Sequence, residues 1–224
     1  MKLGVLSSGG KDSIFTLHKC VEAGHEIKYL ITVFPSTSNS WMFHYPCVEI
    51  TELQSKALGL KLIKVKTSGE KEKEIQDLKK ALTKIKNKIE GLAFGAIAST
   101  YQKTRIDKLC EEIELKSLSP LWQLDQEKIL REEANLMEII IVGVYSEGLD
   151  KNWLGKRIDN NSVKNLIEIS KTYGFSPTGE GGDYETAVLD APLFNKKIVI
   201  ESWLPLWHGM SGFIKIDKMF LKNK

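Results

Sequence analysis

Cysteine is scarce in this sequence, and its copies lie far apart. Cys20, Cys47 and Cys110 form no Cys-x-x-Cys pair, so neither a zinc ribbon nor a disulfide framework is predicted. Cys20 and Cys110 fall within predicted helices, where core positions are expected. Cys47 follows a proline in a loop, and a catalytic thiol there is the less favoured reading, because no basic neighbour in the sequence lowers its pKa. This pattern indicates a reducing compartment, and we expect a cytoplasmic protein.

Long apolar runs and a strong charge imbalance are also missing. The first apolar run, residues 3–6, is too short for a signal peptide, and no later run approaches the ~18 residues of a membrane span. The 32 basic and 29 acidic residues leave a net charge of only +3. So small a net charge gives no electrostatic reason to expect nucleic-acid binding. We therefore expect neither a membrane nor a nucleic acid as a direct partner.

Strands and helices alternate along roughly the first half of the chain. The 224 residues suffice for one large domain, or for one domain with a smaller second one. Alternation of this kind predicts an α/β fold with a parallel sheet and helices on both faces. The expected strands are 3–6, 27–34, 61–65, 92–98 and 117–121, and the expected helices are 12–23, 49–58, 75–89 and 102–114.

The alternation becomes irregular after about residue 122, which predicts a second, smaller α+β domain. We expect the domains to span residues 1–121 and 122–224. The second domain is predicted to contain helices at 126–135 and 163–173, and strands at 138–145, 198–200 and 213–216.

The segment from Ser7 to Ser13, Ser-Ser-Gly-Gly-Lys-Asp-Ser, follows the first strand and opens the first helix. A helix N-terminus offers unpaired N–H groups and partial positive charge, which suits a phosphate. Lys11 is expected to neutralise phosphate charge and Asp12 to hold Mg²⁺, so these two are the predicted catalytic residues. The segment is not a Walker A loop, because Val5 and Asp12 stand where that pattern needs Gly and Ser or Thr. A glycine-rich turn without a ligand is the alternative.

Further candidate residues lie at the carboxyl ends of the second and fourth strands, where α/β sheets bind ligands. For His44 the alternative is a solvated loop histidine, and for Ser99 and Arg105 it is helix capping and surface placement. The predicted ATP-binding residues are Ser7, Ser8, Gly9, Gly10, Lys11, Asp12, Ser13, Thr32, Phe34, His44, Gly95, Ser99 and Arg105.

The loop Ser8-Gly9-Gly10-Lys11-Asp12-Ser13 resembles the pyrophosphate loop of the N-type ATP pyrophosphatases. Members of that superfamily split ATP between its α and β phosphates and adenylate a substrate. The resemblance implies a parallel sheet of five strands in the order 3-2-1-4-5. It also implies that ATP is a substrate of this protein and that Mg²⁺ accompanies it.

Four further segments are similar in order and spacing to the diphthine–ammonia ligases, and with the loop they cover nearly the whole chain. The resemblance implies ATP-dependent amidation, with ammonia, of the diphthine carboxylate on translation elongation factor 2, through an acyl adenylate. Free ammonia is expected because the first strand begins at once and leaves no room for an amidotransferase domain. The segments are Trp41-Met42-Phe43-His44, Gly95-Ala96-Ile97-Ala98-Ser99, Ser119-Pro120-Leu121-Trp122 and Glu180-Gly181-Gly182-Asp183-Tyr184-Glu185-Thr186.

The last segment has three carboxylates beside two glycines, and we expect it to bind the substrate. Diphthine carries a trimethylammonium group, which aromatic faces and carboxylates hold best. Trp153 is the expected aromatic partner from outside the segment. The alternatives are that these acids bind Mg²⁺ or form an acidic surface turn. The predicted substrate-binding residues are Glu180, Gly181, Gly182, Asp183, Tyr184, Glu185, Thr186 and Trp153.

For the function of the whole chain, two alternatives stay open: a tRNA-thiolating enzyme and a non-catalytic ATP-binding module.

Overall fold

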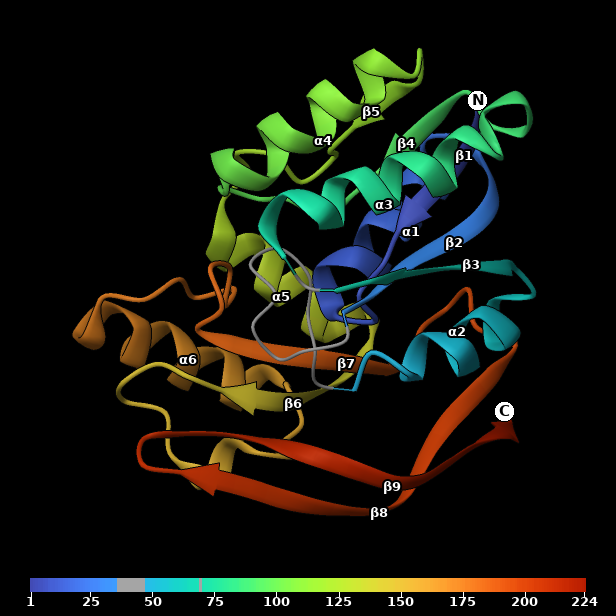
Figure 1. Cartoon of the computed structure of the whole chain (residues 1–224). Helices are drawn as coiled ribbons and strands as arrows, with labels where there is room; N and C mark the ends of the chain where they lie inside the picture. The colour runs from blue at the N-terminus through green and yellow to red at the C-terminus, as the bar shows by residue number, and fades with distance from the viewer. Residues whose placement is uncertain (36–46, 69) are drawn as a thin grey trace.

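The computed structural model describes residues 1–35, 47–68 and 70–224 (Figure 1). The N-terminal half contains a five-stranded parallel sheet in the order β3-β2-β1-β4-β5, which confirms the expected order. Leu3, Val5, Leu30, Ile31 and Leu92 of its central strands are fully buried, as in a sheet covered on both faces. The strands are β1 (Lys2–Leu6), β2 (Glu26–Pro35), β3 (Lys61–Thr67), β4 (Gly91–Ala93) and β5 (Lys116–Leu118).

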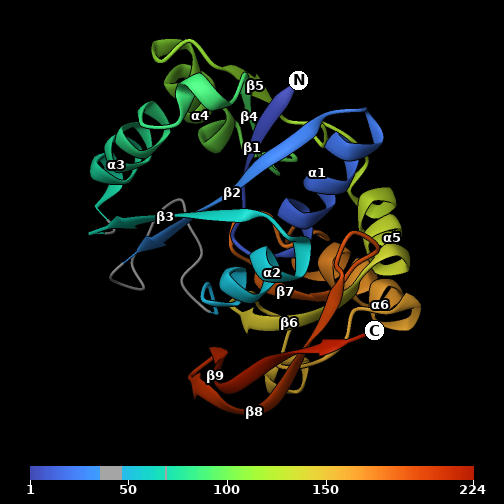
Figure 2. The same cartoon turned by 90° about the vertical axis from the view of Figure 1, so that its right-hand side faces the viewer.

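Four helices cover the two faces of this sheet. On one face α3 (Lys71–Thr83) and α4 (Thr100–Glu112) bury an apolar cluster that includes Leu78 and Ile106. On the other face lie α1 (Lys11–Glu22) and α2 (Ile50–Leu58), between this sheet and a second one (Figure 2).

The second sheet is antiparallel, in the order β7-β6-β9-β8. Its strands are β6 (Glu138–Val144), β7 (Tyr184–Asp190), β8 (Lys196–His208) and β9 (Ser211–Asn223). Beside it lie α5 (Gln126–Leu136) and α6 (Asn160–Tyr173). One buried cluster contains Ile14 and Ile50 from the N-terminal half together with Ile139 and Leu166 from the C-terminal half. The two halves therefore share a core, and the division at residue 121 stays a prediction.

Helix boundaries follow local chemistry. The N-cap residue of α6 is Asp159, whose carboxylate accepts N–H hydrogen bonds from Asn161 and Ser162. The Ser162 hydroxyl in turn accepts the Asp159 N–H, so the two residues form a capping box. The helix ends at Gly174, which has φ 75°, a left-handed conformation that favours glycine.

Several predicted elements were wrong in extent. No strand was expected at β7, and β8 and β9 were predicted as short strands of 198–200 and 213–216, although each has 13 residues. The C-terminal part of β8 does not alternate between apolar and polar residues, because Trp203 and Leu204 are adjacent apolar residues, and Pro205 argues against a strand. The predicted helix 75–89 ends at Thr83, and the predicted strand 92–98 is only Gly91–Ala93.

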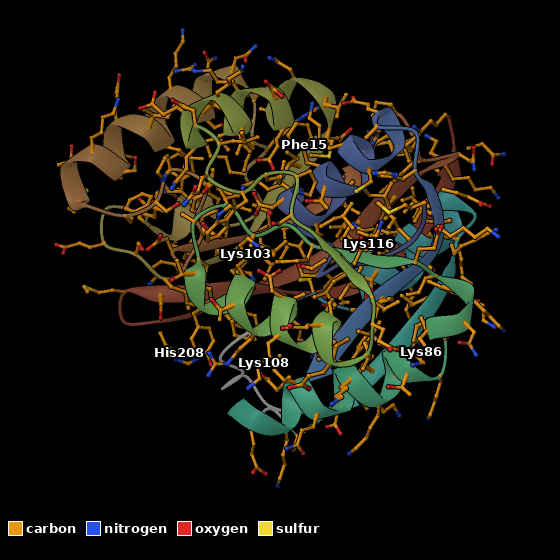
Figure 3. The ribbon with its side chains drawn as sticks, turned by 90° about the horizontal axis from the view of Figure 1, so that it is seen from above. Phe15, Lys86, Lys103, Lys108, Lys116 and His208 are labelled. Carbon is orange, nitrogen blue, oxygen red and sulfur yellow. The ribbon has the colours of Figure 1, made fainter. Side chains whose placement is uncertain are left out.

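Charges of both signs are mixed over the α3 and α4 side of the molecule. Figure 3 shows Lys86, Lys103, Lys108 and Lys116 spread over this side, not gathered at one point. Lys103 pairs with Asp107, and Lys86 with Glu114. Among the described residues no helix is long and apolar enough to cross a membrane.

Gln54, on α2, connects this helix at one buried point to two other segments: the loop that precedes α1, and strand β7. Its side-chain amide donates hydrogen bonds to the carbonyl oxygens of Gly9 and Val188, both at 2.9 Å. Because the side chain is fully buried, water cannot replace these bonds if they are lost.

Gln54→Met keeps the size of the side chain and removes both hydrogen bonds. We expect it to lower the free energy of unfolding by about 1–3 kcal/mol, since buried carbonyl groups lose a donor. Urea denaturation measures the change. Gln76→Met, at an exposed position of α3, is the matched control and should leave the midpoint within error. Equal midpoints for the two variants would contradict the role given to Gln54.

Candidate functional site

The loop from Ser7 to Ser13 is held in shape by the C-terminal half of the chain. The N–H of Val188 donates to the Gly9 carbonyl at 3.0 Å, and the N–H of Lys11 donates to Thr186 Oγ1 at 3.1 Å. Gly9 has φ 88°, and a Cβ there would lie 2.7 Å from Cγ2 of Ile50. Glycine is therefore required at this position both by conformation and by space.

A cavity of about 310 Å³ opens beside this loop. Its walls come from three places in the sequence: the loop itself, the segment after β4, and the turn before β7. A volume of this size suits a small-molecule ligand, and the parallel sheet presents its carboxyl edge here. The lining includes Ser7, Ser8, Gly10, Asp12, Ser13, Gly95, Ala96, Ser99, Tyr101, Gln102, Thr178, Gly179, Glu180, Gly181, Gly182, Tyr184, Glu185 and Thr186.

Most of the predicted site residues are thus brought together, but several do not line the cavity. Thr32 is buried within β2, where its neighbour Val33 lines the cavity instead. The Arg105 guanidinium stacks on the Tyr101 ring, 3.7 Å from its centroid. Gly9, Lys11, Phe34 and Asp183 are likewise absent from the lining. His44 and the predicted motif around it lie outside the described residues.

Trp153 was the expected aromatic partner for the substrate, but it does not line this cavity. It is buried in the core shared by the two halves, and the ammonium of Lys156 lies 4.0 Å from its ring. Its position in the sequence gave no sign of this burial, because a tryptophan serves equally well as a core anchor or a ligand contact.

Glu180 binds the segment that follows β4. Its carboxylate accepts the backbone N–H groups of Ile97, Ala98 and Ser99 at 2.8, 2.5 and 3.1 Å. Ser99 is the N-cap of α4, so the carboxylate lies at the positive end of that helix. Glu180 thereby ties the turn before β7 to the wall formed by the N-terminal half.

Asp183 and Tyr184 stabilise the same turn from within. The Asp183 carboxylate accepts the Ser146 hydroxyl at 2.6 Å and the Ser176 N–H at 3.0 Å. The Tyr184 hydroxyl donates to the Pro177 carbonyl at 2.7 Å. Burial raises the pKa of Tyr184, so the phenol stays protonated. Of the three acids in the segment, Glu185 and Glu180 reach the cavity, and the Glu180 carboxylate is occupied by backbone groups.

The Lys11 side chain does not line the cavity and lies in a buried cluster of charges. Its ammonium lies 2.6 Å from Asp12 Oδ1 and 3.3 Å from Glu133 Oε2. Burial by itself lowers the pKa of Lys11, but the charges of Asp12 and Glu133 outweigh it and raise the pKa above its ordinary value. Glu133, on α5, was not predicted. A single glutamate on an amphipathic helix gives no signal in the sequence that it is buried.

Asp12 is suited to hold Mg²⁺ beside a phosphate. Its side chain is 30% exposed and lines the cavity. Mg²⁺ is typically held by one or two carboxylates when phosphate oxygens and water complete its shell. Among the described residues no group of three or more Cys, His, Asp or Glu side chains forms a ready-made metal centre. A single carboxylate at the cavity, such as that of Asp12, fits a metal that also has phosphate oxygens as ligands.

Cys47 does not line the cavity, and its thiol is not activated. Burial, with the negative charges of Glu49 and Glu185, raises its pKa to about 12. Its sulfur donates to the Ile214 carbonyl at 3.3 Å.

Alkylation should therefore be slow at Cys47. At pH 8 we expect iodoacetamide to modify it at least ~100-fold more slowly than in the urea-unfolded chain, because the thiolate is the reacting form. Mass spectrometry of the peptides measures both rates, with Cys20 and Cys110 followed in the same digest. Equal rates in folded and unfolded protein would show that the thiol is accessible and ionised.

The sequence matches two protein-family models. The first, described as "Diphthamide synthase N-terminal domain", covers residues 1–117, and the second, described as "Diphthamide synthase C-terminal domain", covers residues 125–221. The human protein named "Diphthine--ammonia ligase" is 34% identical over 239 residues, which is 96% of this chain and 89% of the human protein. The Schizosaccharomyces pombe protein of the same name is 36% identical over 245 residues, covering 100% of this chain and 40% of the relative.

A solved structure from Methanocaldococcus jannaschii, named as a predicted subunit of tRNA methyltransferase, aligns with 86% of this chain and 98% of its own. The TM-score is 0.49 and the sequence identity 18%, too low to support an inference about this chain. The two family models and the curated relatives agree over nearly the full length of the sequence. On that agreement, the chain belongs to the diphthamide synthase family, whose curated relatives here are ligases named diphthine–ammonia ligase.

Proposed function

We propose that this protein uses ATP to activate the diphthine carboxylate of translation elongation factor 2 and joins it to ammonia. The products are diphthamide, AMP and pyrophosphate. Family membership supports the reaction, because the curated relatives are named for it. The observation that carries the proposal is the cavity, in whose walls a phosphate loop meets the turn from Glu180 to Thr186. Because the protein substrate belongs to translation, we place the reaction in the cytoplasm.

The phosphate loop would bind the β and γ phosphates of ATP. Helix α1 begins at Lys11 with no side-chain cap from Gly10, and Thr186 accepts the Lys11 N–H, so the next N–H groups of the first turn, those of Asp12 and Ser13, would meet the anion. Ser8 and Ser13 line the cavity, and the Ser8 hydroxyl can donate to a phosphate, whereas the Ser13 hydroxyl donates to the Gly10 carbonyl at 2.9 Å. Asp12 would hold Mg²⁺, which supplies charge neutralisation on the departing pyrophosphate.

The two chemical steps need a carboxylate and a nucleotide in one place. The diphthine carboxylate attacks the α-phosphorus of ATP, and pyrophosphate leaves. Ammonia then attacks the acyl carbon of the adenylate, AMP leaves, and one proton is lost from nitrogen. AMP is a far better leaving group than a carboxylate oxygen. Binding both reactants in one cavity removes the entropy cost of their encounter.

Glu185 and Tyr184 are placed to seat the trimethylammonium group of diphthine. Both line the cavity, and a quaternary cation is held by carboxylates and aromatic faces. Gly181 and Gly182 have open space where a Cβ would stand, so the turn leaves room beside them. Glu180 and Asp183 would support this seat through the backbone, and Trp153 would stabilise the core beneath it.

Mass spectrometry of elongation factor 2 carrying diphthine tests the proposal. With enzyme, ATP, Mg²⁺ and ammonium, we expect conversion to the amide, with one AMP and one pyrophosphate per amide. Asp12→Asn should lower the rate at least ~100-fold, as when other electrostatic stabilisers are lost. Asp77→Asn, on α3 and paired with Lys80, is the matched control and should leave the rate unchanged.

Four other outcomes would separate the alternatives. Release of ADP and orthophosphate would contradict cleavage between the α and β phosphates. AMP formation with tRNA, and none with elongation factor 2, would favour a tRNA-modifying enzyme. ATP binding with no turnover on either substrate would favour a non-catalytic module. Amide formation from glutamine without ammonium would contradict free ammonia as the nitrogen donor.

A further inference from the structure

Lys11 is the residue of the phosphate loop whose place in the structure differs most from expectation. Gly10 and Asp12 on either side of it line the cavity, whereas Lys11 does not, and its side chain is only 1% exposed. If the lysine were already positioned to bind phosphate before the ligand arrives, its ammonium would lie in the cavity. Here the ammonium is directed to carboxylates instead.

Lys11 is fixed at both ends. Its backbone N–H donates to Thr186 Oγ1, and its ammonium donates to Asp12 Oδ1 at 2.6 Å. The second carboxylate, Glu133 at 3.3 Å, belongs to α5, which packs against α1. The three charged groups thus form a chain from the interior to the cavity: Glu133, Lys11, Asp12.

Because these charged groups are buried, the contacts between them are difficult to break. Glu133 is fully buried, and among the described residues Lys11 supplies its only ion pair. Burial raises the pKa of Glu133, the positive charge of Lys11 opposes that rise, and the negative charge of Asp12 adds to it. If Lys11 turned into the cavity, the buried Glu133 carboxyl would lose this contact with the Lys11 ammonium, and a buried polar group that loses its partner is destabilising.

We propose that Glu133 and Lys11 are positioning residues, which form a buried ionic strut that orients the Asp12 carboxylate toward the metal–phosphate complex. Lys11 then acts through Asp12 and does not itself contact phosphate. The proposal rests on the proposed function only in assigning Asp12 to Mg²⁺. It adds Glu133, from the C-terminal half, to the residues that shape the site.

The test uses inorganic pyrophosphate, whose binding needs neither turnover nor protein substrate. Calorimetry gives its affinity in EDTA and in Mg²⁺ for the wild type, Lys11→Met, Glu133→Gln and the double variant. We expect each single variant to bind pyrophosphate in EDTA within ~2-fold of wild type. In Mg²⁺ each should bind ~10-fold more weakly, because Asp12 is misoriented. The double variant should be no weaker than the worse single variant, as for residues of one network.

A second ion pair between the same two helices provides matched controls. Lys19 on α1 lies 3.5 Å from Glu132 on α5, and both side chains are partly exposed. Lys19→Met and Glu132→Gln should leave pyrophosphate affinity unchanged with and without Mg²⁺. Thermal unfolding reports whether each variant is folded. If a single variant unfolds, the double variant stays informative, because it removes both buried groups together.

Two results would overturn the strut. If Lys11→Met weakens binding ~10-fold or more in EDTA while Glu133→Gln does not, Lys11 reaches phosphate directly. If Glu133→Gln leaves binding in Mg²⁺ at the wild-type value, Glu133 does not orient the site. Neither result depends on amide formation, so failure of the strut and failure of the proposed function are distinguishable. In the full reaction, the strut predicts that raising Mg²⁺ partly rescues Glu133→Gln but not Asp12→Asn.

Discussion

The hydrogen bonds between β7 and the phosphate loop are the interaction on which the rest of the site depends. A glycine-rich loop has many conformations open to it, and fixing one of them costs conformational entropy. Val188, Thr186 and Gln54 supply hydrogen bonds that fix the loop before any ligand binds. Since Val188 and Thr186 belong to the second sheet, the N-terminal half carries the loop and the C-terminal half sets its shape.

The polar groups of the segment from Glu180 to Thr186 are explained in the same way, because most of them bind and shape other parts of the site. Glu180 binds three backbone N–H groups beyond β4, and Asp183 stabilises the turn itself. Thr186 accepts the N–H at the start of α1. Glu185 lines the cavity beside them. The segment thus joins three walls of one cavity, and only part of it is left to meet a substrate.

Much of this could be predicted from the sequence, because it depends on local signals. A strand, a glycine-rich turn and a helix start are adjacent in the chain, so the phosphate loop and the parallel sheet follow from short-range patterns and from the family resemblance. The contributions of Gln54 and Glu133 could not be predicted, since they act on residues 45 and more than 100 positions away. The strands β8 and β9 were predicted too short, because the apolar alternation that marks a strand does not run along their full length. Trp153 was misplaced because burial depends on packing that no local pattern encodes.

Pyrophosphate binding by Thr186→Val tests most directly whether the C-terminal half preorganises the phosphate loop. Valine keeps the shape of threonine and removes the oxygen that accepts the Lys11 N–H. The account predicts that affinity falls ~5-fold to ~50-fold, because a hydrogen bond of about 1–2 kcal/mol no longer holds the loop in its binding conformation. Thr172→Val, at an exposed position of α6, should bind as the wild type does. Unchanged affinity in a folded Thr186→Val protein would show that the loop keeps its shape without β7, and would contradict the account.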